Sequence, residues 1–204
     1  MRLIITFLLF IFFIESFSQS FYKSGELPLY NIEPKEYPGQ NPQNHFIHQG
    51  EEGMIYIANT NGILIYDGIH IKRVLGTERK ILNFIRSTEN EIFVGGDGEL
   101  GYITHDSIGN YVYKSFLEII PEALRNIGRV LNTRRIDNKI AFICEKNIFL
   151  FEGHNLFKII SFDEFHSTFR HGSRLFIVGK EKGLLELNSN GEFKEISKSK
   201  LWTN

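Results

Sequence analysis

The sequence predicts an all-β protein built from four repeats of one four-stranded unit. Four segments share the same order: an apolar strand, a short turn containing Gly, Asp or Asn, and a second apolar strand. The segments are Gly53 to Gly68, Glu91 to Ile103, Lys139 to Gly153 and Ser173 to Asn188. Equivalent positions are spaced by 37, 48 and 35 residues, at Ile55, Ile92, Ile140 and Leu175. Periods of this size are typical of repeat architectures.

The second strand of every unit is apolar along almost its whole length, as in Lys139 to Cys144, KIAFIC. A strand with one solvated face would alternate apolar and polar residues, so both faces of this strand are predicted to be covered. The blades of a β-propeller cover one another in this way. A two-sheet sandwich would show alternation in most strands, and runs of Val, Ile, Phe and Tyr with Gly or Asn turns exclude a helical repeat.

We therefore predict a β-propeller of four-stranded antiparallel blades, about four in number, at residues 44–75, 80–116, 128–161 and 165–196. The predicted strands are 45–49, 54–59, 63–67 and 69–75 in the first blade; 81–87, 91–95, 100–105 and 111–116 in the second; 129–135, 139–144, 148–151 and 157–161 in the third; and 166–170, 174–178, 184–187 and 193–196 in the fourth. A short helix within Leu117 to Asn126, interrupted by Pro121, accounts for the spacing of 48.

The first 43 residues precede the blades. Residues 1–18 have the charged start, the apolar run and the small residues of a signal peptide, with cleavage near Ser18 and Gln19. An uncleaved membrane anchor is the alternative, but the apolar run ends too early at Glu15. Residues 19–43 hold four prolines and form an extended lead-in without helix, in which Leu27 to Ile32 could pair at a sheet edge. We expect an exported protein, periplasmic or extracellular after cleavage.

Composition excludes several classes of function. Of the 204 residues, 42% are hydrophobic and 23% are charged, as in an ordinary globular chain. The formal net charge is -1, so no basic excess argues that this segment binds nucleic acid. Cys144 is the single cysteine, which excludes an intramolecular disulfide and a Cys-rich zinc site. We read it as a buried small hydrophobe.

Several residues are predicted to be structural turn or repeat positions: Asn61, Gly62, Asp67, Gly68, Gly96, Gly98, Gly153 and Gly183. Asn61 and Gly62 are predicted to form a two-residue hairpin with positive φ. Gly96 to Gly101 matches a dinucleotide-binding GxGxxG, but that motif works where it opens a helix. Here Tyr102 to Thr104 continues a strand, so a hairpin is predicted and no cofactor is expected.

No catalytic or metal-binding residue is predicted. His45 and His48 would point to opposite faces of a strand, which argues against a shared metal ion. The carboxylate pairs Glu51 with Glu52, Asp97 with Glu99 and Asp163 with Glu164 are interpreted as solvated turn formers. No Ser, His and Asp triad is recognisable by spacing.

Three motifs carry a family resemblance: Pro42-Gln43-Asn44, NTNGILIYDG ending at Gly68, and FVGGDGELGY from Phe93 to Tyr102. With these, the stretch from Leu27 to about Ile196 resembles the periplasmic propeller sensor region of bacterial two-component and triple-tyrosine transcription regulators. The resemblance implies a non-enzymatic, extracytoplasmic sensor of signal transduction whose kinase or DNA-binding output module lies elsewhere. His45, and His70 or Ile71, stand where members of that family carry Trp, so His45 and His70 are the candidate ligand-face residues.

The expected partners are a glycan or another small extracellular ligand, together with further propeller blades or an output module. Residues 197–204 are expected to begin a next segment or to be a truncated end. We expect an incomplete ring that self-associates through exposed apolar residues such as Ile57 and Ile177. The alternative function is an exported propeller enzyme, a glycan hydrolase or lyase with carboxylates on one face, or a carbohydrate-binding propeller.

Overall fold

The computed structural model describes residues 31–50, 52–78, 80, 82–87, 91–162, 165–172, 174–179 and 182–197, with the backbone alone at positions 84, 87, 165 and 166. The predicted signal peptide, most of the predicted edge strand at residues 27–32, the pair Asp163 and Glu164, and positions 198–204 lie outside the described residues. Within the described part of the chain, no helix is long and apolar enough to cross a membrane.

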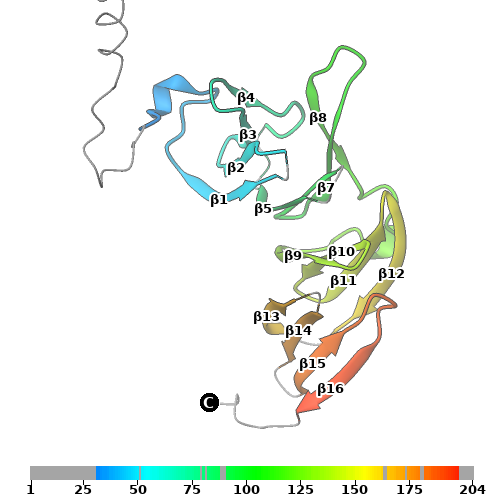
Figure 1. Cartoon of the computed structure of the whole chain (residues 1–204). Coiled ribbons are helices and arrows are strands. Elements are labelled where there is room, and N and C mark those ends of the chain that lie inside the picture. The colour runs from blue at the N-terminus through cyan, green and yellow to red at the C-terminus, as the bar shows by residue number, and fades with distance from the viewer. Residues whose placement is uncertain are drawn as a thin grey trace, which may run out of the picture. The chain divides into compact units, whose positions relative to one another are not determined.

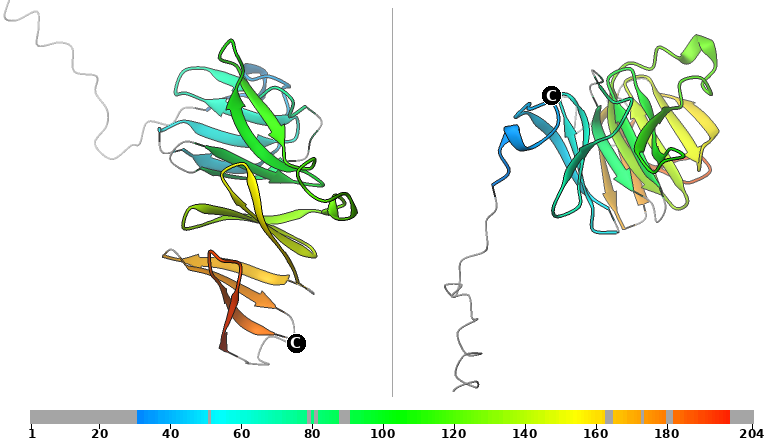
Figure 2. Two further views of the ribbon diagram at one scale, coloured as in Figure 1. Left: turned by 90° about the vertical axis from the view of Figure 1, so that its right-hand side faces the viewer. Right: turned by 90° about the horizontal axis from the view of Figure 1, so that it is seen from above.

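The described residues form four sheets, each of four consecutive antiparallel strands (Figure 1). The first sheet contains β1 (Asn44–Gln49), β2 (Ile55–Asn59), β3 (Gly62–Tyr66) and β4 (Ile71–Arg73), and the second β5 (Leu82–Ser87), β6 (Ile92–Gly96), β7 (Leu100–His105) and β8 (Tyr111–Ser115). The third contains β9 (Val130–Ile136), β10 (Lys139–Cys144), β11 (Asn147–Glu152) and β12 (Asn155–Ser161), and the fourth β13 (Phe165–His171), β14 (Arg174–Gly179), β15 (Gly183–Leu187) and β16 (Phe193–Ser197). The predicted blades of a β-propeller are confirmed, and Figure 2 shows them from two further sides.

Three apolar clusters join successive blades. One unites the first and second blades through residues such as Tyr56, Ile65 and Val94. Another unites the second and third through Phe93, Phe142 and others, and the last unites the third and fourth. Each blade is therefore held by side chains of its neighbour in sequence.

Strand β10 shows how one strand serves two interfaces. All six of its residues are buried. Ile140, Phe142 and Cys144 belong to the cluster shared with the second blade, whereas Ala141 and Ile143 belong to the cluster shared with the fourth. The strand keeps the two-residue period of side-chain direction, but both directions are apolar because both faces are covered. This confirms the interpretation for β6 and β10, whereas Ile55 and Ile57 on β2 are only half-buried.

Aromatic rings fill the interface between the second and third blades. Phe116 stacks on Phe151 at a centroid distance of 4.3 Å, and Phe142 meets Phe151 edge to face at 5.7 Å. The insertion after β8 closes this interface, since Ile120 and Ile127 are buried in the same cluster. The helix predicted in the insertion is reduced to the 3₁₀ turn η3 (Glu122–Leu124), which starts after Pro121.

The lead-in departs from its prediction at one point. A 3₁₀ turn, η2 (Pro34–Glu36), occurs where no helix was predicted, because Pro34 stands at the first helical position, where a missing N–H costs nothing. After this turn the lead-in is anchored to the first hairpin. Asn59 Nδ2 donates to the carbonyl of Asn41 at 2.8 Å, and Asn61 Nδ2 donates to that of Gly39 at 2.9 Å.

The tip of the first hairpin lies one residue earlier than predicted. Asn59 pairs with Gly62, so Thr60 and Asn61 form the tip. Only Gly62 has the predicted positive φ, +113°, and Asn61 does not. Asn61 keeps an ordinary φ while its backbone N–H donates to the side chain of Asn59 at 3.0 Å.

Ile177 also differs from its prediction as an exposed apolar residue. It is fully buried in the cluster between the third and fourth blades, because its side chain points toward the third blade. Ile57 is half-buried. The exposed apolar side chains of these two blades include Ile47 and Phe169 instead, at 63% and 43%. Self-association stays a prediction.

Gly62 lies against the linker to the second blade. A Cβ built there would lie 2.4 Å from Thr77 Oγ1 and 2.9 Å from the Thr77 carbonyl oxygen. Thr77 is itself fixed, since its hydroxyl donates to the Val74 carbonyl at 2.7 Å and accepts from the Ile63 N–H at 3.0 Å. Close approach and positive φ therefore both require glycine here.

We predict that Gly62→Ala lowers the free energy of unfolding by about 2 to 5 kcal/mol, the sum of left-handed strain and overpacking. Gly68→Ala is the matched control, because Gly68 has a φ of +97° but nothing within 4 Å of a built Cβ. Gly68→Ala should lower the free energy of unfolding by about 1 to 2 kcal/mol, because only the strain of the backbone contributes. Chemical denaturation of both variants measures the difference, and equal costs would show that Thr77 does not confine Gly62.

Candidate functional site

A pocket of about 330 Å³ opens where the first, second and third blades present their turns. It is lined by Glu52, Tyr56, Glu91, Ile92, Tyr102, Ile103, Thr104, His105, Tyr111 and His154. Two carboxylates, three phenols and two imidazoles thus surround a small apolar floor. Aromatic walls with a few polar groups are typical of small-molecule sites.

The polar residues come from turns at one end of the blades. Glu52 lies in the turn between β1 and β2, and Glu91 directly precedes β6. His105 ends β7, and His154 lies in the turn between β11 and β12. These turns gather at one end because all four sheets are antiparallel meanders with the same strand order.

On the first-blade side, Glu52 and Tyr56 form a bonded pair. The Tyr56 hydroxyl donates to Glu52 Oε1 at 2.5 Å. Burial, together with the bond to Glu52 and its negative charge, raises the pKa of Tyr56 well above its usual range. Burial likewise raises the pKa of Tyr111, with Glu52 and Asp67 as further causes. Both phenols therefore remain hydrogen-bond donors at neutral pH.

On the opposite side, His154 joins the second blade to the third. Its Nε2 lies 2.5 Å from Glu91 Oε1. Its ring stacks on Tyr102 at a centroid distance of 3.8 Å, and Tyr102 in turn stacks on Phe116 at 5.1 Å. The turn that carries His154 is thus fixed against the second blade by both a polar and an aromatic contact.

This arrangement provides hydrogen-bond acceptors, phenolic donors and flat aromatic faces within one small volume. Those features suit a neutral, polyhydroxylated ligand that can use donors and acceptors together. Among the residues the structure describes, no group of three or more His, Cys, Asp or Glu side chains could hold a metal ion.

The structure does not bring the two predicted ligand-face histidines together. His45 lies at the start of β1, where its Nε2 is 3.1 Å from Thr60 Oγ1. His70 lies in the connection between β3 and β4, at the other end of the sheet. There Asp67 Oδ1 accepts the backbone N–H of His70 at 2.6 Å. Neither lines the pocket. Ligand contact at His45 or His70 stays a prediction.

The predicted turn residues lie in turns or at the strand ends beside them. Gly68, Gly98, Gly153 and Gly183 all have positive φ, and Gly96 ends β6. The GxGxxG is a hairpin, since β7 begins at Leu100 and no helix follows. Backbone hydrogen bonds from His70 and Ile69 lower the pKa of Asp67.

Cys144 is buried as expected, and burial raises the pKa of its thiol to about 12.

Sequence reasoning missed the main pocket residues. His154 and Glu91 are separated by 63 positions, and their pairing depends on the packing of the third blade on the second. Glu52 is an exposed turn residue, as it was read from the sequence, but its carboxylate also accepts the Tyr56 hydroxyl. No repeat signal links the two residues, because Glu91 lies in the turn between the first and second strands of its blade and His154 in the turn between the third and fourth strands.

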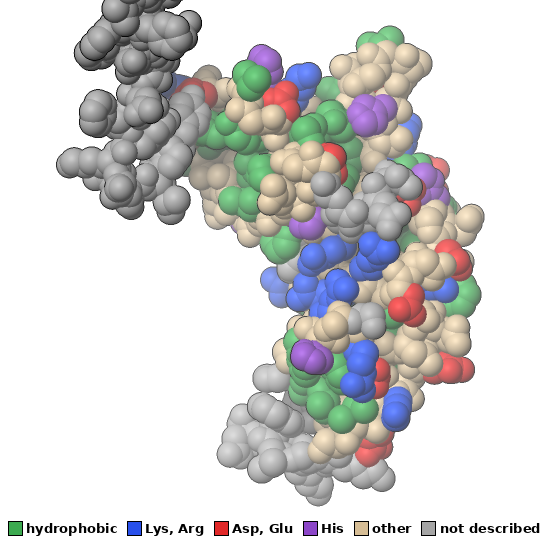
Figure 3. All heavy atoms as spheres, viewed as in Figure 1, with side chains coloured by type: hydrophobic (Ala, Val, Ile, Leu, Met, Phe, Trp, Pro, Cys, Tyr) green, Lys and Arg blue, Asp and Glu red, His purple; other side chains and the backbone are tan. Residues whose placement is uncertain are grey.

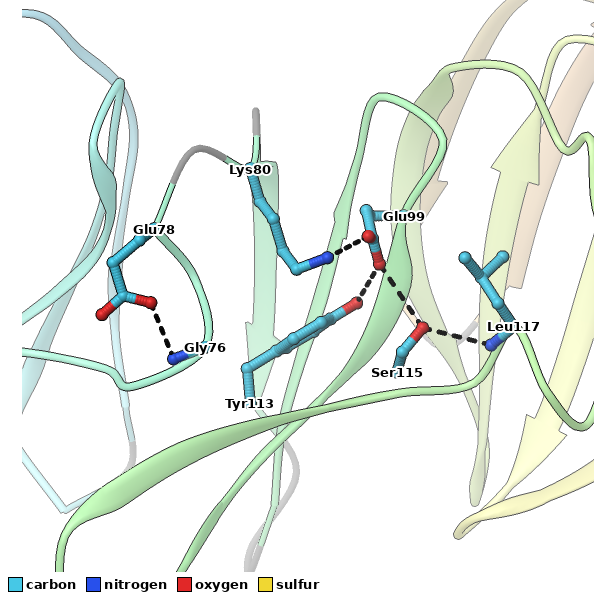
Figure 4. Close-up of polar contacts among 7 residues, drawn as sticks. All are labelled: Gly76, Glu78, Lys80, Glu99, Tyr113, Ser115 and Leu117. Atoms are coloured by element: carbon cyan, nitrogen blue, oxygen red, sulfur yellow. Dashed lines mark hydrogen bonds and ion pairs between the residues drawn. The ribbon is translucent and has the colours of Figure 1, made fainter.

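Glu99 was also read as a solvated turn former, and that is wrong. Its side chain is only 17% exposed and pairs with Lys80 from the linker between blades (Figure 4). The Tyr113 hydroxyl lies 3.1 Å from Glu99 Oε2, and the Ser115 hydroxyl lies 3.4 Å from it. The three-residue turn after β6 directs Glu99 toward β8, so this carboxylate ties the linker to the outer strand.

Comparison with known proteins gives the fold a context. No protein-family model matches the chain, and no curated protein matches it. The extracellular domain of the hybrid two-component system BT4673 from B. thetaiotaomicron is similar in structure, with a TM-score of 0.51 and 17% identity over 79% of this chain. The chain has the fold of that domain. It spans only 22% of that domain's length.

The extracellular domain of another hybrid two-component system of B. thetaiotaomicron, BT3049, has a TM-score of 0.35 at 12% identity. That likeness covers 83% of this chain and 32% of the other. The BT4673 likeness agrees with the resemblance seen in the sequence and, at its low identity, establishes the fold alone.

We predict that Glu99→Ala lowers the free energy of unfolding by about 1 to 3 kcal/mol, because Tyr113 and Lys80 lose their shared acceptor. Glu78→Ala is the matched control in the same region. Glu78 is 39% exposed and accepts the Gly76 N–H at 2.9 Å (Figure 4). It also lies 3.4 Å from Arg73 Nε. Its loss should cost less than about 1 kcal/mol. Urea denaturation measures the free energy of unfolding of both variants, and equal losses would contradict a linking role for Glu99.

Proposed function

We propose that this chain is an extracytoplasmic, non-enzymatic sensing segment of a bacterial signal-transduction receptor. In this proposal the pocket between Glu52 and His154 takes a small glycan. Binding is passed to further blades and to an output module that controls transcription. The exported location predicted from residues 1–18 is part of the proposal.

The observation that carries this proposal is the run of four consecutive blades with the fold of the BT4673 domain, which is described as extracellular and as part of a hybrid two-component system. The sequence motifs at Pro42, Asn59 to Gly68 and Phe93 to Tyr102 support the same assignment. Fold does not by itself imply function, so the pocket provides the separate argument for a ligand.

The pocket supports a glycan because its polar groups are already arranged as donors and acceptors. Glu52 and Tyr56 form one such pair, and Glu91 and His154 form another, on opposite sides of a space of about 330 Å³. A sugar hydroxyl can donate to one group while accepting from the other. Tyr111 supplies an aromatic ring against which an apolar sugar face can pack.

A glycan hydrolase is the second candidate, because Glu52 and Glu91 place two carboxylates in one pocket. Each of them, however, is engaged by a neighbouring side chain of its own. This pairing favours ligand binding over acid–base chemistry, for which a carboxyl must exchange its proton with the substrate.

The test is a titration of the full chain with a panel of neutral oligosaccharides, followed by calorimetry and by chromatography of the sugars. We expect saturable binding without cleavage, weakened about tenfold or more by His154→Ala and by Glu91→Gln. His171→Ala is the control, since His171 is an exposed histidine outside the pocket.

Equal binding by His154→Ala and the control would contradict the assignment of this pocket. Cleavage products that disappear in Glu52→Gln or Glu91→Gln would replace the sensor proposal with the hydrolase. Absence of binding to every sugar in the panel would contradict a neutral glycan as the ligand.

A further inference from the structure

Three successive blades carry an arginine near the end of their first strand. Arg86 lies on β5, Arg134 on β9 and Arg170 on β13. Arg86 pairs with Phe93 and Arg134 with Ala141, and these partners occupy the same position of the repeat. Arg170 pairs with Leu175, one position earlier on the second strand of the fourth blade. The first strands therefore place guanidinium groups at nearly one level.

The first strand of the third blade, β9, lies against both β5 and β6 of the second blade and contacts β13 of the fourth. A Cβ built on Gly95, in the second blade, would lie 2.7 Å from Val130 Cγ1 and 2.9 Å from Thr133 Oγ1 of β9. Farther along, Asn132 Nδ2 of β9 donates to Thr168 Oγ1 of β13 at 3.1 Å. Long arginine side chains on these strands are thus neighbours, and Figure 3 shows Lys and Arg side chains gathered on this face of the molecule.

These arginines lack acidic partners within the described part of the chain. The Nε atoms of Arg86 and Arg134 are buried and make no hydrogen bond there. Arg170 Nε donates to a backbone carbonyl, that of Gly172, at 2.5 Å. Arg174 shows the contrast, because its guanidinium pairs with Glu186 through two bonds of 2.5 and 2.6 Å.

Electrostatics agree with this geometry. Burial lowers the pKa of Arg86, and the positive charges of Arg134 and Arg170 lower it further. Burial and Arg170 act in the same direction on the pKa of Arg134. On β1, burial followed by the charge of Arg86 lowers the pKa of His48. Partly buried like charges without a counterion are costly, so a bound anion would relieve them.

We propose that Arg86, Arg134 and Arg170 form a binding site for an oxyanion, the carboxylate, sulfate or phosphate group of a small ligand. The planar guanidinium binds such groups through two parallel N–H bonds. Three positive charges favour a doubly charged oxyanion over a single one. None of the three arginines lines the pocket described above.

The inference extends the proposed function by adding an acidic group to the ligands that the sensor takes, and its test does not depend on the neutral glycan. The full chain is titrated with sodium sulfate, sodium phosphate and sodium glucuronate at constant ionic strength, with sodium chloride and glucose as references. We expect saturable thermal stabilisation by sulfate and phosphate, and weaker stabilisation by glucuronate, which carries a single negative charge. Glucose and chloride should give none.

The variants Arg86→Gln and Arg134→Gln should weaken sulfate binding about tenfold or more. Without added anion they should be at least as stable as the parent chain, because like-charge repulsion is removed. Arg134→Lys should also bind weakly, since it keeps the charge but loses the planar fork. Arg129→Gln is the control, because Arg129 is 59% exposed and lies 3.9 Å from Glu145.

Sulfate that stabilises the parent and all variants equally would be a general salt effect and would overturn the site. If Arg86→Gln or Arg134→Gln fails to fold, Arg170→Gln, whose side chain lies at the surface, decides by the same titration. Loss of anion binding with intact neutral sugar binding, or the reverse, tells the two sites apart. His154→Ala should leave the sulfate response unchanged.

Discussion

The burial of both faces of the middle strands is the constraint on which the rest of the structure depends. In β10, alternate side chains enter two different clusters, one with the second blade and one with the fourth. A single four-stranded sheet has no second layer to cover such a strand, so each blade needs its neighbours. The stacked rings of Phe116 and Phe151 make the interface between the second and third blades largely aromatic.

This packing places the functional groups at the margins of the sheets. Where the turns of successive blades meet, Glu91 and His154 pair across an interface that the aromatic cluster has already fixed. Where the first strands approach one another, Arg86 and Arg134 become neighbours. Both arrangements consist of residues from different blades, so both depend on the angle and distance that the apolar clusters impose. Under the proposed function, a ligand bound at either arrangement would act on the contact between blades.

Local patterns in the sequence predict most of the fold. The apolar run of β10 and the turn glycine Gly183 each carry their own signal, because strand propensity and positive φ are properties of neighbouring residues. The pocket has no such signal, since Glu91 and His154 meet only after two blades pack. Ile177 was assigned to the wrong face for the same reason: alternation defines two faces but does not say which neighbour covers each.

Hydrogen exchange of the native chain, followed by mass spectrometry, tests the dependence on blade packing most directly. Amides of β6, β10 and β11, whose side chains are nearly all buried, should exchange only through global unfolding. Amides of β16, which lies at the margin with exposed side chains, should exchange through local opening at much lower free energy. Exchange from β10 as fast as from β16 would contradict the account, because it would mean that each sheet opens without regard to its neighbours.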